Sequence, residues 1–455
     1  MKRHIKYLVI FLIVLLPSVK EGTAQESYLL KELRIPQVAQ ENPGSVIPYD
    51  AHICFPLVGK IHVGVNSPIN YGDIMTVSDK LLDRVKKNNA IRIWGQIDPV
   101  HFGFRANKKN YISITTAIKT DANISFKKDL ASFMIKGNGP FEGKELSFLG
   151  NDFLLVNSYA EIGVGYNREV NDDISFGVNV KYLLGLFNAY TSKAELLLYT
   201  GDKYHELNVS HTLQGKMAGI VKYDSNGVRV EDIYENLKNH GFAIDVGARY
   251  RINRLVEINA SVLDIGLIRW KTNAKQYNVI DKTFSVVGIQ YDDVFKDTGT
   301  AISNLDPNGY LREIADTITN NFIADLEESS SYTKWLNLRF NVGGSIYASP
   351  NDRFNFTFTG KFINGVFVPS GCISYHRNCG KWFDFVVGNT FKTNAIFNPG
   401  VGLNLTLEVF QIYLAVDYAN TFIFIDRARN LNVALGVNFV APLSKAKVFK
   451  ASYPY

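Results

Sequence analysis

The sequence lacks the features that define several large classes of proteins. Its 455 residues include only 3 Cys, too few for a disulfide-stapled scaffold or an array of zinc fingers. Beyond the N-terminal segment there is no run of about 18 apolar residues, the length at which a membrane-spanning helix is predicted. These absences exclude a small disulfide-rich domain and a mature protein built from membrane helices.

Signatures of catalysis are absent as well. The sequence has no G-x-S-x-G, no H-E-x-x-H and no phosphate-binding glycine loop, and its 8 His show no spacing typical of a metal pair. We therefore predict no enzyme, no metal site and no cofactor. The net charge of +6 is spread along the chain, so it does not predict nucleic-acid binding. With 46% hydrophobic and 20% charged residues, the chain is not disordered either.

The N-terminus has the layout of a secretory signal peptide. Lys2, Arg3 and Lys6 give a basic start, residues 7–16 are apolar, and small and polar residues follow Pro17. The apolar core is too short to cross a bilayer as a helix, although an uncleaved N-terminal anchor is the alternative interpretation. We predict a signal peptide over residues 1–25 and an exported mature chain.

Most of the mature chain alternates between apolar and polar residues, the pattern of a strand with two different faces. In 242–252, Phe242, Ile244 and Val246 fall on one face, while Asp245 and Gly247 fall on the other. The same pattern recurs in 100–107, 160–167, 174–182, 336–343, 354–361, 401–408 and 431–439.

The length and the faces of these runs favour a membrane barrel over a soluble sandwich. A transmembrane strand needs about 9–11 residues, whereas soluble strands average about 5–6. The polar face is rich in Gly, Asn, Ser and Thr, as in a barrel lumen, and the apolar face suits lipid. We predict a transmembrane antiparallel β-barrel of about 14 strands over residues 51–441, with between about 12 and 16 strands allowed.

The connections between the runs alternate between short and long, as in bacterial barrels. Tight turns are predicted at 107–110, 168–173, 252–254, 349–352 and near Val409, and long connections at 67–90, 127–153, 215–240 and 269–331. Apolar residues spaced three and four apart predict a helix over 311–327 and shorter helices over 78–88 and 231–239. The segments 204–214, 274–290 and 370–378 stay ambiguous, and residues 442–455 form a basic tail.

Charged residues on the polar face are candidates for the lumen. Arg249 and Glu257 would lie opposite each other in a hairpin centred on Asn253. Such charges are tolerated only away from lipid, so we expect them either to pair structurally or to line a conduction path. The full set comprises Asp245, Arg249, Arg251, Glu257, Arg339, Lys361, Glu408 and Asp417.

Two cysteines allow a further expectation. If 370–381 is a hairpin centred between Tyr375 and His376, Cys372 and Cys379 lie directly opposite each other. An oxidising compartment would then permit a disulfide between them, with two free thiols as the alternative.

The order of several short motifs resembles a family of barrels. They are Glu41–Gly44 (ENPG), His52–Gly59 (HICFPLVG), Phe133–Gly143 (FMIKGNGPFEG), the KYL of Lys181–Leu183 and Val262–Trp270 (VLDIGLIRW). This order, over about residues 27–440, resembles an uncharacterised family of Bacteroidota outer-membrane barrels. That family is in turn similar to the long-chain fatty-acid transporter superfamily, which includes the PorV-type components of type IX secretion.

The resemblance implies a small N-terminal hatch inside the barrel, which we assign to residues 26–50. Asn42 and Pro43 match the Asn-Pro-Ala motif of the superfamily's hatch, and Gly44 replaces the Ala. It also implies passage of hydrophobic or small solutes across the outer membrane, with outer-membrane lipid and a hydrophobic ligand as partners. The alternative is a barrel that docks cell-envelope or secretion proteins through its loops.

Overall fold

A computed structural model of the chain describes residues 27–442, except 77–79, 151, 202–205, 220, 225–226, 231–237, 288–325, 364 and 393–395. The predicted signal peptide and nearly all of the basic tail lie outside the described residues. In the described part of the chain, no helix combines the length and the apolar character needed to cross a membrane.

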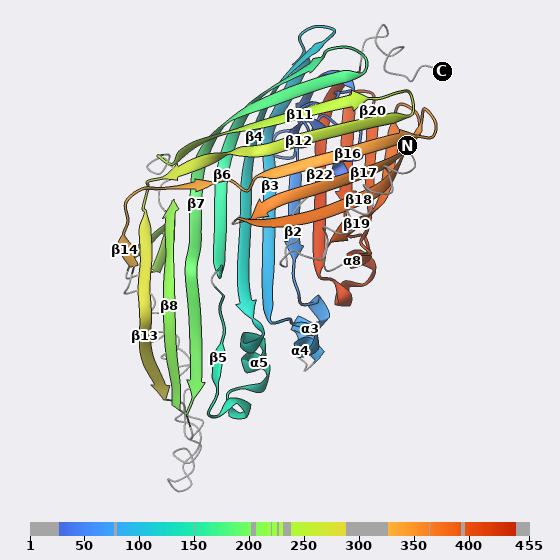
Figure 1. Cartoon of the computed structure of the whole chain (residues 1–455). Helices are drawn as coiled ribbons and strands as arrows, with labels where there is room; N and C mark the ends of the chain where they lie inside the picture. Colours follow the sequence, from blue (N-terminus) through green and yellow to red (C-terminus); the bar gives the residue numbers. More distant parts are fainter. Residues whose placement is uncertain are drawn as a thin grey trace.

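The chain forms a closed antiparallel β-barrel of 14 strands, which confirms the predicted fold (Figure 1). Two of these 14 strands are interrupted. β1 and β2 together make one of them, and β15 and β16 together make the other. The last strand pairs with both β1 and β2 and closes the wall, so the barrel leaves no free edge. The wall consists of β1 (Tyr49–Cys54), β2 (Ile61–Asn66), β3 (Asn88–Arg105), β4 (Asn110–Lys127), β6 (Leu154–Glu169), β7 (Ile174–Thr200), β11 (His240–Arg251), β12 (Val256–Trp270), β15 (Tyr332–Trp335), β16 (Arg339–Tyr347), β17 (Asp352–Ile363), β18 (Val366–Asn378), β19 (Phe383–Lys392), β20 (Pro399–Leu407), β21 (Phe410–Val416) and β22 (Asn430–Pro442).

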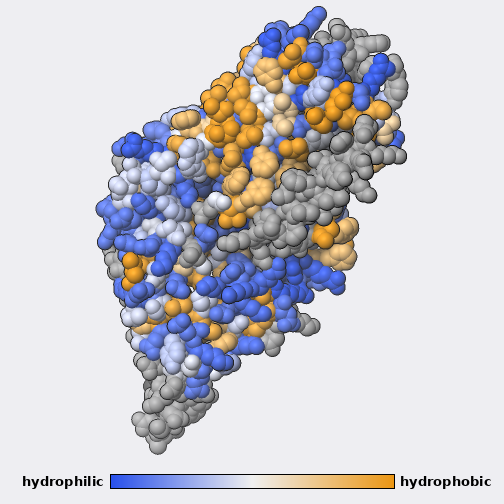
Figure 2. Space-filling view, viewed as in Figure 1, coloured by the Kyte–Doolittle hydropathy of each residue, from blue (hydrophilic) through white to orange (hydrophobic). Residues whose placement is uncertain are grey.

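The two faces of the wall have opposite character. In β11, Phe242, Val246 and Tyr250 are exposed on the outside, whereas Asp245 is fully buried on the inside. Such outward apolar residues recur around the wall, and Figure 2 shows them as an orange band. A broad apolar belt of this kind would be unfavourable in water and identifies the surface that faces lipid.

The two ends of the barrel also differ. The turns 106–109, 170–173, 252–255, 348–351, 379–382 and 408–409 close one end, where the first wall strand begins and the last one ends. At the other end the connections after β2, β4, β7 and β12 are long, and α3 (Tyr71–Thr76) and α4 (Lys80–Arg84) lie there. This confirms the predicted alternation, although one connection at the long end, between β17 and β18, is itself tight.

Part of the sheet continues beyond the barrel, and we call this part the blade. The far half of β7 leaves the wall and pairs with β5 (Glu145–Ser147) and β8 (Glu206–Gly219). β8 pairs in turn with β13 (Lys275–Val287), and β13 pairs with β14 (Leu326–Glu328). One face of the blade packs against α5 (Lys128–Lys136) and η2 (Gly139–Phe141) around an apolar cluster that includes Phe148 and Leu198. A small hairpin of β9 (Val221–Asp224) and β10 (Gly227–Val230) follows β8.

The three ambiguous segments are therefore all strands, but only β18 belongs to the wall. β8 and β13 alternate as wall strands do because the blade continues the same sheet. The helix predicted over 311–327 falls outside the described residues up to 325, and the residues that follow begin β14.

The disulfide expected between Cys372 and Cys379 is wrong. Residues 366–378 form one continuous strand, and the turn lies at 379–382. Cys372 therefore faces Thr357 and Thr390 in the neighbouring strands, while Cys379 lies at the turn. Both thiols are free.

Residues 27–48 fold inside the barrel and form the hatch. They contain the short helices η1 (Leu30–Glu32) and α2 (Val38–Glu41), and the wall begins at Tyr49. The first half of the hatch carries an apolar cluster: Leu29, Leu30 and Ile35 are buried against the inner side of β18, β19, β21 and β22. The second half is polar and carries the groups of the candidate site.

Candidate functional site

The wall is interrupted twice, and we call the first interruption the seam. It comprises residues 55–60, which interrupt the first wall strand between β1 and β2, and the bulge at Asp98 and Pro99 in the facing strand β3. Leu57 adopts a left-handed backbone with φ of 66°, which a regular strand does not contain. The loss of strand geometry is thus local and affects two neighbouring strands at the same level.

The seam is closed by backbone hydrogen bonds on both sides. Phe55 N donates to Val437 O and Val437 N to Val58 O, each at 2.9 Å. On the other side, Leu57 N donates to Pro99 O at 3.2 Å and Asp98 N to Lys60 O at 2.9 Å. Four bonds replace a regular ladder, so this part of the wall is held less tightly than the strands around it.

The two sides of the seam differ in chemistry. Phe55, Pro56 and Leu57 are exposed on the outside, within the lipid-facing surface. Gly59 and Lys60 are buried on the inside. At the seam the wall therefore has an apolar outer side and a polar inner side.

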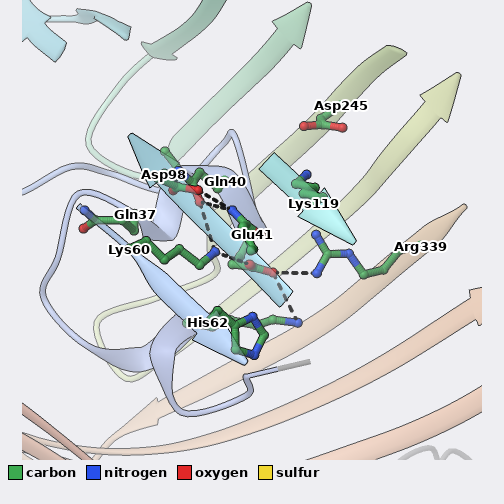
Figure 3. Close-up of polar contacts among 12 residues, drawn as sticks. Gln37, Gln40, Glu41, Lys60, His62, Asp98, Lys119, Asp245 and Arg339 are labelled. Atoms are coloured by element: carbon green, nitrogen blue, oxygen red, sulfur yellow. Dashed lines mark hydrogen bonds and ion pairs between the residues drawn. The ribbon is translucent and has the colours of Figure 1, made fainter. Parts of the chain in front are cut away.

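Side chains of the hatch bind the inner side of the seam (Figure 3). Gln37 Nε2 donates to Gly59 O at 3.0 Å and to Asn438 Oδ1 of β22 at 2.7 Å. Gln40 Nε2 donates to Asp98 Oδ2 at 2.6 Å. Lys60 Nζ donates in turn to Gln40 Oε1 at 3.0 Å. Helix α2 thus bridges both sides of the interruption.

Glu41, the last residue of α2, is the ionic anchor of the hatch. Its carboxylate lies 2.9 Å from Arg339 Nη1, 3.5 Å from Lys60 Nζ and 3.9 Å from Lys31 Nζ. Burial alone would raise the pKa of Glu41, but Arg339, Lys60 and Lys31 together outweigh it and hold this pKa well below its usual range. The carboxylate is therefore ionised when the hatch is seated.

A second ionic cluster lies across the lumen from Glu41 and belongs to the wall. Lys181 Nζ is 2.6 Å from Asp245 Oδ2 and 2.9 Å from Asp264 Oδ1. Lys119 Nζ is 3.0 Å from Glu161 Oε2. Opposite charges nearly balance here, as buried ionised groups require.

A small cavity lies between the two clusters. It measures about 20 Å³, room for about one water molecule. Its lining includes Gln40, Glu41 and Lys60 on one side and Lys119 and Lys181 on the other. At this level the hatch plugs the lumen.

The hatch motif Asn42, Pro43 and Gly44 docks on a surface made by glycines of β7 and β11. Asn42 Nδ2 donates to Ala248 O at 3.2 Å. A Cβ added at Gly177 would lie 2.0 Å from Pro43 O, and one added at Gly247 would lie 2.1 Å from Asn42 Oδ1. At Gly177 and Gly247 the wall therefore has no side chain, which leaves room for the close approach of the hatch.

Asn167 and Ser175 fix the same motif from the wall. Asn167 Nδ2 donates to Pro43 O at 2.6 Å, and Ser175 Oγ donates to Gly44 O at 2.6 Å. Gly44 is itself necessary, since a Cβ there would lie 2.6 Å from Ala248 Cα.

Most of the charges predicted for the lumen do lie inside and have partners. Asp245 pairs with Lys181, and Arg339 with Glu41, as described above. The remaining contacts are Lys361 Nζ to Asp121 Oδ2 at 3.2 Å, Arg249 Nε to Glu257 Oε2 at 2.9 Å, Arg251 Nε to Glu257 Oε2 at 3.8 Å, and Leu29 N to Asp417 Oδ1 at 3.1 Å. This arrangement favours the structural interpretation of these charges over a conduction path.

Two details of the prediction are wrong. Glu408 is exposed in the turn between β20 and β21, because its strand ends at Leu407. Arg249 lies directly opposite Asn259, and Arg251 lies opposite Glu257. The hairpin is centred one residue later than expected, so the Arg249–Glu257 ion pair runs diagonally between the strands.

Several residues of the site were not predicted. The alternating strands β4, β6 and β7 contain Lys119, Glu161 and Lys181. These residues fall at polar-face positions of the alternation, which alone would have placed them in the lumen. Lys60 and Asp98 gave no such signal, because each lies where the alternation breaks down.

Comparisons with known proteins give a family and a set of distant barrels. The model of a family of unknown function, DUF5723, matches residues 43–417. A search of curated proteins found no match. Among solved structures, the toluene transporter TbuX of Ralstonia pickettii is 8% identical with a TM-score of 0.43, covering 90% of this chain and 95% of that chain.

Two further barrels are similarly distant. A Pseudomonas aeruginosa FadL homologue is 9% identical with a TM-score of 0.39, covering 90% of this chain and 94% of that one. The translocator domain of the autotransporter NalP from Neisseria meningitidis is 7% identical with a TM-score of 0.33, covering 86% and 88%. Sequence identities and TM-scores this low do not identify a solute for this chain.

Proposed function

We propose, from the premise that this chain belongs to the DUF5723 family of unknown function, that it passes hydrophobic small molecules across the outer membrane. The observation that carries the proposal is the seam, where an apolar outer surface and a polar interior meet at an interrupted strand whose inner side the hatch contacts. In this proposal the end of the barrel with short turns faces the periplasm and the end with long connections faces outward.

The route follows from what blocks the lumen. In this proposal the hatch and the ionic clusters block the direct way through the lumen, and the cavity between them has space for about one water molecule. Movement of α2 would remove the side-chain contacts that Gln37 and Gln40 make with Gly59, Lys60 and Asp98, and the route further requires the four backbone hydrogen bonds of the seam to open. A hydrophobic solute could then exchange between the lumen and the membrane through the seam without crossing bulk water.

A disulfide that locks the hatch to the wall tests this route. The amides of Gln37 and Asn438 make two hydrogen bonds with each other, at 2.7 and 3.1 Å, so the two side chains are adjacent. Cells carrying Gln37→Cys with Asn438→Cys should admit the hydrophobic dye N-phenyl-1-naphthylamine only under reducing conditions. Under oxidising conditions, dye entry should fall to the level of cells without the chain.

The matched control is a cysteine pair within the wall. Ser345 and Asn355 lie opposite each other in β16 and β17, with Ser345 Oγ 2.8 Å from Asn355 Oδ1, and neither touches α2. Ser345→Cys with Asn355→Cys should leave dye entry unchanged when oxidised. If the hatch–wall pair forms its disulfide and dye entry persists, movement of the hatch is not required and the proposed route is wrong.

The blade supports a second candidate function, the docking of a cell-envelope protein. It extends the sheet beyond the wall and has an apolar cluster of its own, so it is a built element rather than a loose loop. Deleting residues 303–330 should abolish cross-linking to such a partner and spare dye entry. Loss of dye entry together with cross-linking would count against a separate docking role.

A further inference from the structure

The strands of the wall are short on one side of the barrel. β20 has 9 residues and β21 has 7, whereas β3 and β4 have 18 each. At a rise of about 3.3 Å per residue and a tilt near 45°, β21 spans about 16 Å of membrane depth and β3 about 42 Å. The apolar band of an outer-membrane barrel is about 25 Å tall. β21 alone therefore leaves roughly 9 Å of that depth without wall.

Exposed apolar residues lie directly beyond this low side, and we call them the crown. They follow β19 and β21 at the end of the barrel with long connections, in and around α8 (Asn420–Ile423) and η5 (Ile425–Arg427). Each is between 52% and 76% exposed, which is unusual for large apolar side chains in water. The crown comprises Ile396, Phe397, Phe422, Ile423, Phe424 and Ile425. In Figure 2 an orange patch lies at the position of α8 in Figure 1.

The crown is held in place by hydrogen bonds. Ala419 N donates to Pro399 O at 2.8 Å, and Thr421 Oγ1 donates to Asn430 O at 2.5 Å. Tyr71 N donates to Ala428 O at 3.0 Å, which ties α3 to the end of η5. An ordered segment therefore presents these apolar side chains to the surroundings.

Val416 is less exposed than the other outward residues of its strand. Ile412, Leu414 and Val416 share the outward parity of β21, while Gln411, Tyr413 and Ala415 point inward and are buried. Ile412 and Leu414 are exposed, as lipid-facing residues are, but Val416 is only 8% exposed. The chain that leads into the crown thus begins at the end of β21, directly after an outward-facing row of apolar residues.

We infer that the crown inserts into the outer leaflet of the membrane and completes the apolar belt above β20 and β21. Its occupant is the acyl chains of the lipid, because the crown continues a surface that already faces lipid and spans the depth that the short strands leave open. The charged side chains of Asp426 and Arg427 follow the apolar run and are largely exposed, as expected at the headgroup level. The inference requires the membrane barrel but not the passage of solutes.

Quenching by brominated lipid tests this inference. The Phe424→Trp variant is reconstituted into vesicles of ordinary phosphatidylcholine and of phosphatidylcholine brominated on its acyl chains. The fluorescence of the unchanged protein, which has 4 Trp, is subtracted in each lipid. We expect the added fluorescence to fall at least twofold in brominated vesicles. Phe397→Trp provides a second position in the crown, should Phe424→Trp fail to fold.

The matched control is Met134→Trp on α5, which is 74% exposed and follows the long strand β4. Since the wall there already exceeds the apolar band, brominated lipid should leave its fluorescence nearly unchanged. Equal fluorescence of the crown variants in the two lipids would overturn the inference. So would quenching of the crown variants by aqueous iodide in place of lipid, which would identify a surface that collects solutes from water.

Discussion

Among single residues, Glu41 determines how firmly the hatch is seated. Arg339, Lys60 and Lys31 converge on its carboxylate from the wall and from the hatch itself. Removing one partner of a buried ion pair typically costs about 3–5 kcal/mol, because the remaining charge stays buried and poorly compensated. The seated hatch is therefore sensitive to a change at any one of these positions.

The Arg339→Met variant tests this sensitivity. We expect limited proteolysis to cleave the hatch faster in Arg339→Met than in the unchanged protein, while the wall strands stay resistant. Adding Glu41→Gln should not restore the protection, since Lys60 and Lys31 then lose their carboxylate partner as well. A hatch equally protected in all three proteins would show that Glu41 does not anchor it.

The same carboxylate sets a pH dependence. Because the pKa of Glu41 is lowered in the folded state, its stabilising contribution is present above its ordinary pKa of about 4.3 and is lost only as the pH falls further. Proteolysis of the hatch should therefore proceed at the same rate at pH 7 and pH 5, measured with a protease active at both. Release of the hatch between these two values would contradict the assigned ionic anchor.

Between elements, the contact of the hatch with β7 and β11 depends on the absence of side chains. Gly177→Ala and Gly247→Ala would each place a Cβ about 2 Å from the hatch, so the hatch must move. We expect both variants to lose protection of the hatch from protease but to keep a barrel that resists SDS without heating. Gly95→Ala, where the nearest atom is 4.0 Å away, should behave as the unchanged protein does.

The strands could be predicted from the sequence because a wall with one apolar and one polar face imposes a period of two. The parity of β11 placed Asp245 and Arg249 inside the barrel, and both lie there. Register could not be predicted with the same success, because it depends on the turn: Asn253 Oδ1 accepts from the backbone N–H of Leu255 and of Val256, which centres that hairpin one residue later.

Contacts between distant segments were beyond a local pattern. Gln37 meets Asn438, and Glu41 meets Arg339, across most of the length of the chain. Alternation also gave no sign of where a sheet leaves the barrel, so β8 and β13 could not be distinguished from wall strands. The seam was missed for the opposite reason, since residues 55–60 do not alternate and resemble a loop.

For the whole molecule, the barrel is uneven. One side extends into the blade through the 27 residues of β7, and the other side ends at the 7 residues of β21 below the crown. Between these sides the lumen is closed by an internal segment that is itself held by ion pairs. The proposed function requires both features of this architecture, a lumen that the hatch blocks and a wall that can open at the seam.

The most direct test of this account is ionic conductance in a planar lipid bilayer. The unchanged protein should insert without producing steady conductance steps, because the hatch and the two ionic clusters leave room for about one water molecule. The Arg339→Met variant should produce discrete openings as its hatch leaves the lumen. Steady open conductance of the unchanged protein, as large as that of the variant, would contradict a lumen plugged by the hatch.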